Sequence, residues 1–210
     1  MAITVHHLAN SRSQRVLWLL EELALEYTIT RYERDPQSMM APADLKRVHP
    51  LGKSPVIVDE DAGVTVAETG AIVEYLVGRA GGAFGGPDDP EGARNYRFWL
   101  HYAEGSMMPP LLLKLAMSRV PVLGRFAMRK VQPMIDVHLD YVEAQLNQRE
   151  WFVGAELSAA DVMMSFPLEA AQHRAGLDED RPSTMRWLAR IHARPAYRTA
   201  LARGGPYDYA

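Results

Sequence analysis

The chain has 210 residues, no cysteine and a formal net charge of −3. The lack of cysteine excludes disulfides, thiolate zinc sites and a Cys-x-x-Cys redox mechanism carried by the protein itself. The slightly acidic charge argues against general affinity for nucleic acid, which needs clustered Lys and Arg. Hydrophobic residues make up 48% of the sequence, which is enough to give one large domain or two small ones a buried core.

The opening residues, MAITVHHLANSRSQRV, lack a charged segment followed by an apolar core, so no signal peptide is expected. No apolar run reaches the ~18 residues needed to span a bilayer. The histidines are scattered and show no paired His/carboxylate spacing, so no metal site is expected. We therefore expect a soluble cytoplasmic protein without a metal, a membrane partner or a nucleic-acid partner.

The first part of the chain predicts a strand, a helix and a second strand. Residues 2–8 alternate apolar and polar side chains and are rich in β-formers. Residues 26–34 alternate enough to form a second strand. A strand–helix–strand unit of this length is usually parallel. The helix between the strands places apolar residues on its buried side at Val16, Leu17, Leu19, Leu20 and Leu23.

A polar segment, Asn10 to Ser13, lies between the first strand and this helix. Ligands of open α/β sheets collect at the carboxyl ends of strands, and a helix N-terminus favours an anion. Ser11 is the candidate for a functional hydroxyl here, and Asn10 and Ser13 are the other candidates. The alternative is that Ser11 and Ser13 only cap the helix.

Residues 49–76 predict a turn, a β-hairpin and the start of a helix. His49-Pro50-Leu51-Gly52 is turn chemistry, and two β-branched runs, 56–58 and 64–66, flank a polar connection at 59–63. A helical pattern opens at Glu68-Thr69.

The same stretch carries groups that suit a small zwitterionic peptide. The Ser54-Pro55 bond can be cis, which would turn the Ser54 N–H and C=O outward to pair with an extended peptide. Thr69 and the free N–H groups of the helix start suit a carboxylate. Lys53 could meet a second carboxylate and Glu68 an ammonium group.

The remainder of the chain reads as helical after a linker at 78–92, GRAGGAFGGPDDPEG. A long helix from about Pro90 should be bent or interrupted at Pro109-Pro110. A second long helix is predicted over 123–148. Ser158 and Asp161 have the spacing of a capping box, to which we assign a structural role. Two shorter helices should follow, around 187–191 and 195–197.

The order Gly-Lys-Ser-Pro-Val-Ile followed by Ala-Glu-Thr-Gly-Ala-Ile resembles the glutathione site of cytosolic glutathione transferases. With the serine segment, the linker and the cap at Ser158, the resemblance covers essentially the whole chain. It implies an α/β plus all-α fold. Residues 1–82 would form a thioredoxin-like glutathione-binding domain, followed by an all-helical domain at 88–210 that contributes the electrophile pocket. The resemblance is to serine-using members of the bacterial, theta or delta type, and homodimers are the family expectation.

The resemblance also implies roles for individual residues. Ser11 would be catalytic, donating a hydrogen bond to the sulfur of glutathione, with Asn10 and Ser13 beside it. The glutathione thiolate would then attack a hydrophobic electrophile or a peroxide. Further implied ligands of glutathione are Lys53 at the glycine carboxylate, the Ser54 backbone before Pro55 at the cysteinyl amide, and Glu68 and Thr69 at the γ-glutamyl end. An apolar pocket beside glutathione would be lined by Tyr102, Ser106, Met107 and Leu112.

Two positions depart from the family pattern: Thr69 stands where serine is usual, and Ser54 where an apolar residue is usual. Two other functions stay open. The protein could be a glutathione-binding regulatory or ligand-carrier protein without turnover, or a glutathione-dependent disulfide reductase that needs no protein cysteine.

Overall fold

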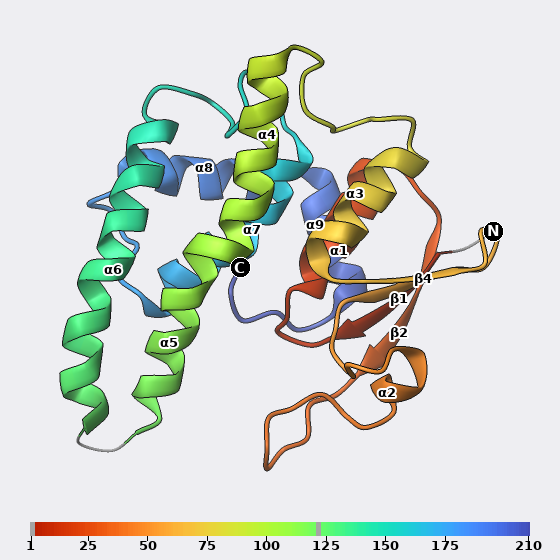
Figure 1. Ribbon diagram of the computed structural model, residues 1–210, viewed down its shortest axis with the longest axis horizontal. Helices are drawn as coiled ribbons and strands as arrows, with labels where there is room; N and C mark the ends of the chain where they lie inside the picture. The colour runs from red at the N-terminus through yellow and green to blue at the C-terminus, as the bar shows by residue number, and fades with distance from the viewer. Residues whose placement is uncertain (1–2, 121–122) are drawn as a thin grey trace. The chain divides into compact units, whose positions relative to one another are not determined.

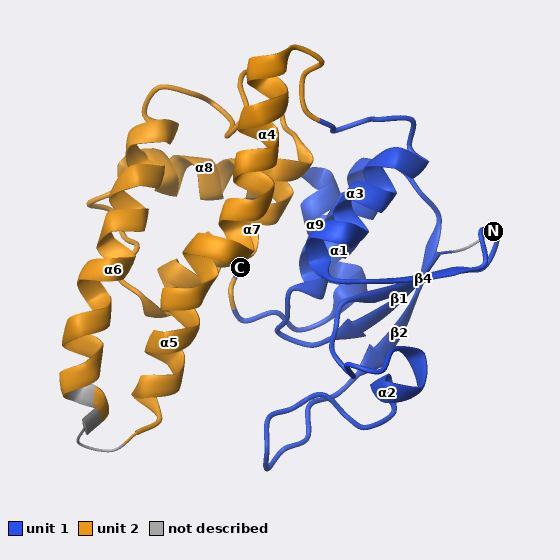
Figure 2. Cartoon of the chain, in the orientation of Figure 1, with its two compact units in different colours: residues 1–85, 192–208, 210 blue, residues 86–191, 209 orange. Residues whose placement is uncertain are grey.

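The computed structural model describes residues 3–120 and 123–210, and the chain divides into two compact units (Figures 1 and 2). Unit 1 comprises Met1–Gly85, His192–Asp208 and Ala210, and unit 2 comprises Gly86–Ile191 and Tyr209. Within the described residues, no helix is both long enough and apolar enough to cross a membrane.

Unit 1 is built on a four-stranded sheet in the order β2-β1-β3-β4. The strands are β1 (Ile3–Leu8), β2 (Tyr27–Tyr32), β3 (Val56–Asp59) and β4 (Val64–Ala67). β2 runs parallel to β1, whereas β3 is antiparallel to both β1 and β4. The predicted parallel unit and the predicted hairpin are therefore confirmed, and their order is that of a thioredoxin-like domain.

The helices of unit 1 include α1 (Ser13–Glu22) and α3 (Thr69–Arg79). Every side chain of α1 from Ser13 to Leu20 is buried, because α1 packs against β1, α3 and the last helix of the chain. The structure adds a four-residue helix, α2 (Leu45–Val48), that the sequence pattern did not predict.

The last helix, α9 (Pro195–Gly204), belongs to unit 1, whereas the sequence division assigned all of residues 88–210 to the helical domain. The physical reason is its packing on α1. Trp18 meets Tyr197 edge to face with ring centroids 5.3 Å apart, and Arg194 forms an ion pair with Glu22. These contacts join residues far apart in sequence, so periodicity alone could not reveal them.

The regular structure in the described part of unit 2 is helical, as the sequence predicts, apart from an isolated bridge between Trp151 and Gly154. Its helices are α4 (Pro90–Tyr102), α5 (Met108–Ser118), α6 (Leu123–Leu146), α7 (Ala159–Arg174) and α8 (Pro182–His192). α7 is the core helix, with every residue from Ala159 to Ala171 buried. The predicted interruption of the first long helix is present, but it is a π-helical turn at Ala103–Met107, and the two prolines begin α5 instead. Pro109 and Pro110 have no N–H group to donate to the preceding turn, and their rings would clash with its carbonyls. The wider π-helical turn directly before them accommodates both effects.

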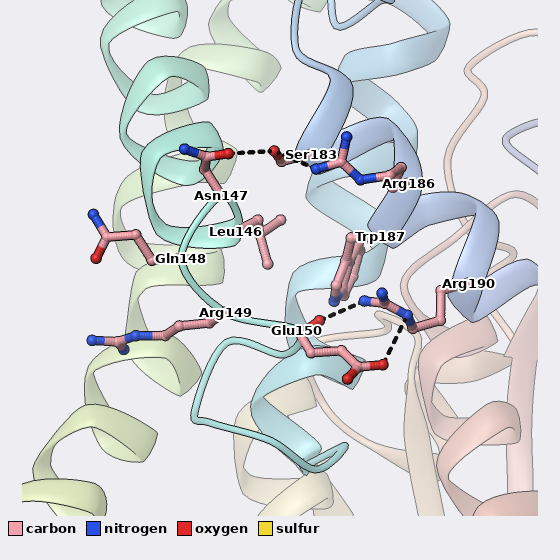
Figure 3. Close-up of a pocket in the computed structure, with 9 residues that line it drawn as sticks. All are labelled: Leu146, Asn147, Gln148, Arg149, Glu150, Ser183, Arg186, Trp187 and Arg190. Carbon is pink, nitrogen blue, oxygen red and sulfur yellow. Dashed lines mark hydrogen bonds and ion pairs between the residues drawn. The ribbon is translucent and has the colours of Figure 1, made fainter.

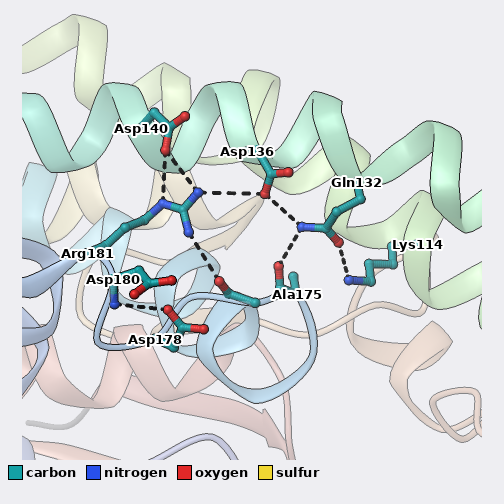
Figure 4. Close-up of polar contacts among 9 residues, drawn as sticks. Lys114, Gln132, Asp136, Asp140, Ala175, Asp178, Asp180 and Arg181 are labelled. Carbon is teal, nitrogen blue, oxygen red and sulfur yellow. Dashed lines mark hydrogen bonds and ion pairs between the residues drawn. The ribbon is translucent and has the colours of Figure 1, made fainter.

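A polar network joins the middle of α6 to the connection between α7 and α8 (Figure 4). Arg181 donates to Asp140 Oδ1 from Nη2 at 2.9 Å, and Gln132 Nε2 donates to the Ala175 carbonyl at 3.0 Å. Gln132 also accepts from Lys114 of α5. Several of these groups are partly exposed, so we assign the network to the positioning of helices, with modest energy per pair.

Candidate functional site

Three polar segments of unit 1 meet at one edge of its sheet. The register pairs His6 of β1 with Val56 of β3, and Val56 with Ala67 of β4. Because β1 ends at this edge, β3 begins there and β4 ends there, the segments 9–13, 53–55 and 68–69 lie together. A direct contact supports this placement, since Ser54 Oγ donates to the His6 carbonyl at 2.9 Å.

Ser11 is 7% exposed and lies between β1 and α1. Its Oγ accepts a hydrogen bond from the Ser13 N–H at 3.2 Å and lies 2.7 Å from Ser13 Oγ. The residue directly before α1 is Arg12, which makes no side-chain cap. Ser11 therefore accepts one backbone hydrogen bond just before the helix, as the capping alternative requires. Its hydroxyl hydrogen is not used in that bond and can turn toward a ligand.

Asn10 and Ser13 have different surroundings from Ser11. Asn10 adopts a positive φ of 52°, donates from Nδ2 to Asp208 Oδ2 at 2.7 Å and accepts from the Asp208 N–H at 2.8 Å. Ser13 is fully buried. Arg34 donates to the Asn10 carbonyl at 3.0 Å. These contacts shape the segment around Ser11, and sequence reasoning missed Arg34 and Asp208 because no local pattern marks them.

The Ser54-Pro55 peptide bond is cis, as the sequence allowed. Pro55 is buried, while Ser54 is half-buried and Lys53 is exposed. Within residues 3–120 and 123–210, nothing pairs with the backbone N–H or C=O of Ser54. Both groups are therefore open to an extended ligand.

Glu68 has the unusual backbone conformation φ 71°, ψ 125° immediately before α3, and its side chain is exposed. A positive φ at a residue other than glycine costs of order 1–3 kcal/mol, and such strain gathers at ligand sites. Thr69, the first residue of α3, is 5% exposed. No side chain caps α3, so the N–H groups of its first turn can receive a carboxylate.

The predicted pocket residues lie in unit 2. Tyr102 and Met107 are buried there, and Tyr102 Oη lies 2.6 Å from His138 Nδ1. Burial raises the pKa of Tyr102, with a smaller contribution from Tyr141. Ser106 is half-buried in the π-helical turn, and Leu112 on α5 is 42% exposed. Their role in substrate binding stays a prediction.

A separate pocket of roughly 300 Å³ lies in unit 2 at the end of α6, beside α8 (Figure 3). Arg190 Nε pairs with Glu150 Oε1 at 3.3 Å, and Arg186 Nη2 donates to Ser183 Oγ at 2.9 Å. These two arginines already have partners, and we assign no ligand to the pocket. Across the described residues, no group of three or more His, Asp or Glu side chains could hold a metal ion.

Comparisons with known proteins match both parts of the sequence. Residues 11–78 match the family model described as glutathione S-transferase, N-terminal domain, and residues 126–195 match the one described as glutathione S-transferase, C-terminal domain. Glutathione S-transferase 3 of Schizosaccharomyces pombe is 36% identical, covering 96% of this chain and 87% of the relative. Glutathione S-transferase 1 of Saccharomyces cerevisiae is 34% identical, with 93% and 92% covered. A solved glutathione S-transferase from Actinobacillus pleuropneumoniae has a TM-score of 0.88 at 34% identity, covering 99% of this chain and 95% of that one.

Proposed function

Since the chain belongs to the glutathione transferase family, we propose that it activates the thiol of bound glutathione for attack on a hydrophobic electrophile. The observation that carries the proposal is the position of Ser11. Its buried hydroxyl follows β1 at the sheet edge shared with Ser54 and the start of α3. A peptide held along that edge would bring its central side chain to Ser11.

In this proposal, Ser11 stabilises the thiolate anion of glutathione. A free thiol with a pKa near ~8.5 is only a few per cent thiolate at neutral pH. A hydrogen bond to a charged group contributes about 1.5–3 kcal/mol, which corresponds to a pKa lowering of roughly one to two units. The thiolate then forms a carbon–sulfur bond while the leaving group departs with its electron pair. Ser11 is a donor throughout and never the nucleophile.

The other two segments at this edge, 53–55 and 68–69, supply the remaining contacts to glutathione. The unpaired N–H and C=O of Ser54 pair with the cysteinyl backbone, and Lys53 meets the glycine carboxylate. Thr69 and the first N–H groups of α3 hold the γ-glutamyl carboxylate, and Glu68 accepts from the γ-glutamyl ammonium. The strained backbone of Glu68 supports this assignment, because such strain clusters at ligand sites.

Binding is tested by Thr69→Val, which keeps the side-chain shape and removes the hydroxyl. We expect the Kd for glutathione, measured by calorimetry, to rise roughly tenfold because one hydrogen bond to a carboxylate is lost. The matched control is Thr65→Val on exposed β4, which should leave the Kd unchanged. Equal Kd values for the two variants would remove Thr69 from the site.

Turnover is tested with the unmodified protein, glutathione and a chlorodinitrobenzene. Formation of the thioether is the expected result. Tight glutathione binding without conjugation would favour a ligand carrier, and reduction of a glutathione mixed disulfide in its place would favour a disulfide reductase. Absence of glutathione binding would overturn the proposed function.

Homodimerisation is proposed for a stripe of exposed apolar side chains on α6. Phe126, Met134, Val137 and Tyr141 are 65%, 52%, 68% and 39% exposed, and their spacing places them on one helix face. A second copy of the chain is the occupant that the family supports. An apolar face of this kind is uncommon on a monomer surface.

Val137→Glu should convert the dimer to a monomer, because it places a charge in the middle of the apolar stripe. Sedimentation velocity gives the oligomeric state. Gln148→Glu, at an exposed position beyond the end of α6, adds the same charge and should leave the dimer intact. A monomeric unmodified protein, or a dimer that survives Val137→Glu, would contradict this interface.

A further inference from the structure

A chain of hydrogen bonds runs from Ser11 into the interior of unit 1. Ser11 Oγ lies 2.7 Å from Ser13 Oγ, which lies 2.8 Å from His7 Nδ1. The other side of the His7 ring bonds to the backbone of Gly204 in α9. All three side chains are buried, with exposed fractions of 7%, 0% and 3% for Ser11, Ser13 and His7.

Glycine at position 204 permits this close approach of α9. A Cβ there would lie 2.8 Å from Gln14 Oε1 and 2.9 Å from Leu17 Cδ1, both on α1, and 3.5 Å from His7 Nε2. The main chain of α9 therefore reaches the His7 ring only because residue 204 has no side chain. The inner end of the hydrogen-bond chain, at His7, is held by the backbone of Gly204, so the His7 ring cannot turn.

The direction of each hydrogen bond follows from this fixed end. A carbonyl only accepts, so His7 Nε2 carries the hydrogen that it donates to Gly204. Burial lowers the pKa of His7 to about 4, and the nearby Arg31 acts in the same sense, while the Gly204 contact acts in the opposite sense. The ring is therefore neutral at pH 7, and its Nδ1 can only accept.

Ser13 has one hydroxyl hydrogen and two acceptors within reach, His7 Nδ1 at 2.8 Å and the Leu8 carbonyl at 3.3 Å. The shorter contact, to His7, takes the hydrogen. If Ser13 did not donate to Nδ1, the ring would hold a buried acceptor without a donor, which costs about 1–3 kcal/mol. Ser13 Oγ in turn accepts from the Leu8 N–H at 3.3 Å. In the contact between the two serines, Ser11 must then be the donor. Its hydrogen points inward, away from the ligand side.

We propose that Ser13 is a positioning residue whose Oγ competes with the sulfur of glutathione for the single hydroxyl hydrogen of Ser11. His7 maintains this competition, because it takes the hydroxyl hydrogen of Ser13 and so leaves Ser13 Oγ as an acceptor. The inference rests on the proposed function of Ser11. When the thiol gives up its proton to water, the Ser11 hydrogen turns from Ser13 Oγ to the sulfur anion. The Ser13 N–H keeps hold of Ser11 Oγ during this turn. Thiolate formation therefore requires that one internal hydrogen bond be broken.

The test is the thiol pKa of bound glutathione, read from ultraviolet thiolate absorbance across pH. Ser13→Ala removes the competing acceptor, so the bound thiol pKa should fall by roughly half to one unit, the value of one ordinary hydrogen bond. A merely structural role of Ser13 would loosen the site and raise this pKa or leave it unchanged, and either result would overturn the proposal. In Ser11→Ala, the additional change Ser13→Ala should have no effect.

A pair of His7 variants gives an independent readout should Ser13→Ala fail to fold. His7→Leu removes the acceptor of Ser13 at 2.8 Å, and the Ser13 hydrogen should then turn to Ser11 Oγ at 2.7 Å in preference to the Leu8 carbonyl at 3.3 Å, so the bound thiol pKa should again fall. His7→Asn restores an acceptor near the position of Nδ1 and should return the pKa toward the unmodified value. Equal pKa values in the two variants would overturn the role of His7.

The proposed function and this inference fail differently. If the unmodified protein binds glutathione and forms the thioether, while Ser13→Ala and His7→Leu leave the thiol pKa unchanged, only the competition is refuted. If the unmodified protein does not bind glutathione, the proposed function fails and the inference is refuted with it.

Discussion

Ser11→Ala is expected to lower kcat/KM for the electrophile, at saturating glutathione, by roughly 10- to 100-fold at neutral pH. The variant loses a hydrogen bond to a charged sulfur, which contributes about 1.5–3 kcal/mol. The pKa of the bound thiol should rise by roughly one to two units for the same reason. Glutathione affinity should fall by no more than a few-fold at neutral pH, because the lost hydrogen bond stabilises only the ionised fraction of the bound thiol and the ligands of the peptide ends are intact.

The pH profile separates this mechanism from general damage to the site. Since the thiolate is the reactive species, kcat/KM for the electrophile at saturating glutathione rises with pH through the pKa of the bound thiol, and Ser11→Ala should shift that rise to higher pH. Above both pKa values the rates of variant and unmodified protein should converge. A loss of the same size at every pH would mean that Ser11 positions the substrate and does not tune the thiol.

Ser118→Ala is a matched control for this substitution. Ser118 lies at the exposed end of α5, where its Oγ donates to the Leu115 carbonyl at 2.8 Å. Removing it should leave kcat/KM and the thiol pKa unchanged. If Ser11→Ala behaves like this control, Ser11 is not the activator, and a glutathione carrier or a disulfide reductase becomes the better account.

The part of the fold that local periodicity governs could be predicted from the sequence. The alternating segments 2–8 and 26–34 contain β1 and β2, and the two β-branched runs of the hairpin became β3 and β4. Glycine and proline placed the linker, since α3 ends at Arg79 and α4 begins at Pro90. These features depend on neighbours in sequence, whose side chains repeat with the period of a strand or a helix.

The part that depends on distant residues could not be predicted. Asn10 bonds to Asp208 across 198 positions, and His7 reaches Gly204 only because α9 packs on α1. No periodicity records such contacts. The candidate site shows the same division: Ser11, Ser54 and Glu68 stand in recognisable local patterns. The partners that set the direction of the Ser11 hydroxyl are fixed by tertiary packing.

Asp161 is the residue of unit 2 at which we expect a substitution to lower stability most, because its fully buried carboxylate accepts hydrogen bonds from four donors. Oδ1 accepts from the Phe152 N–H at 3.0 Å and from Trp187 Nε1 at 3.2 Å. Oδ2 accepts from the N–H and the Oγ of Ser158, each at 3.0 Å. The predicted capping box at the start of α7 is confirmed, and the structure adds ties to α8 and to the segment before the cap.

Asp161→Ala should therefore lower the free energy of unfolding by about 3 kcal/mol or more, because several buried donors lose their acceptor together. For a chain of this size, that corresponds to a fall in Tm of roughly 6–12 °C. Ser158→Ala removes a single capping hydroxyl and should cost about 1 kcal/mol. Denaturant unfolding of both variants, beside the exposed control Asp178→Ala, gives the comparison.

The pH of that measurement matters, because burial raises the pKa of Asp161 to about 6 and the four donors only partly offset the rise. A raised pKa means that the folded state binds the proton more tightly than the unfolded chain. The contribution of this carboxyl to stability therefore falls as pH rises from about 4 to about 6, and is constant above. Above pH 7 the carboxyl of Asp161 is ionised, so the comparison of Asp161→Ala with Ser158→Ala measures the ionised capping box alone. A cost for Asp161→Ala no larger than that for Ser158→Ala would show that the ties to Phe152 and Trp187 add nothing to the cap.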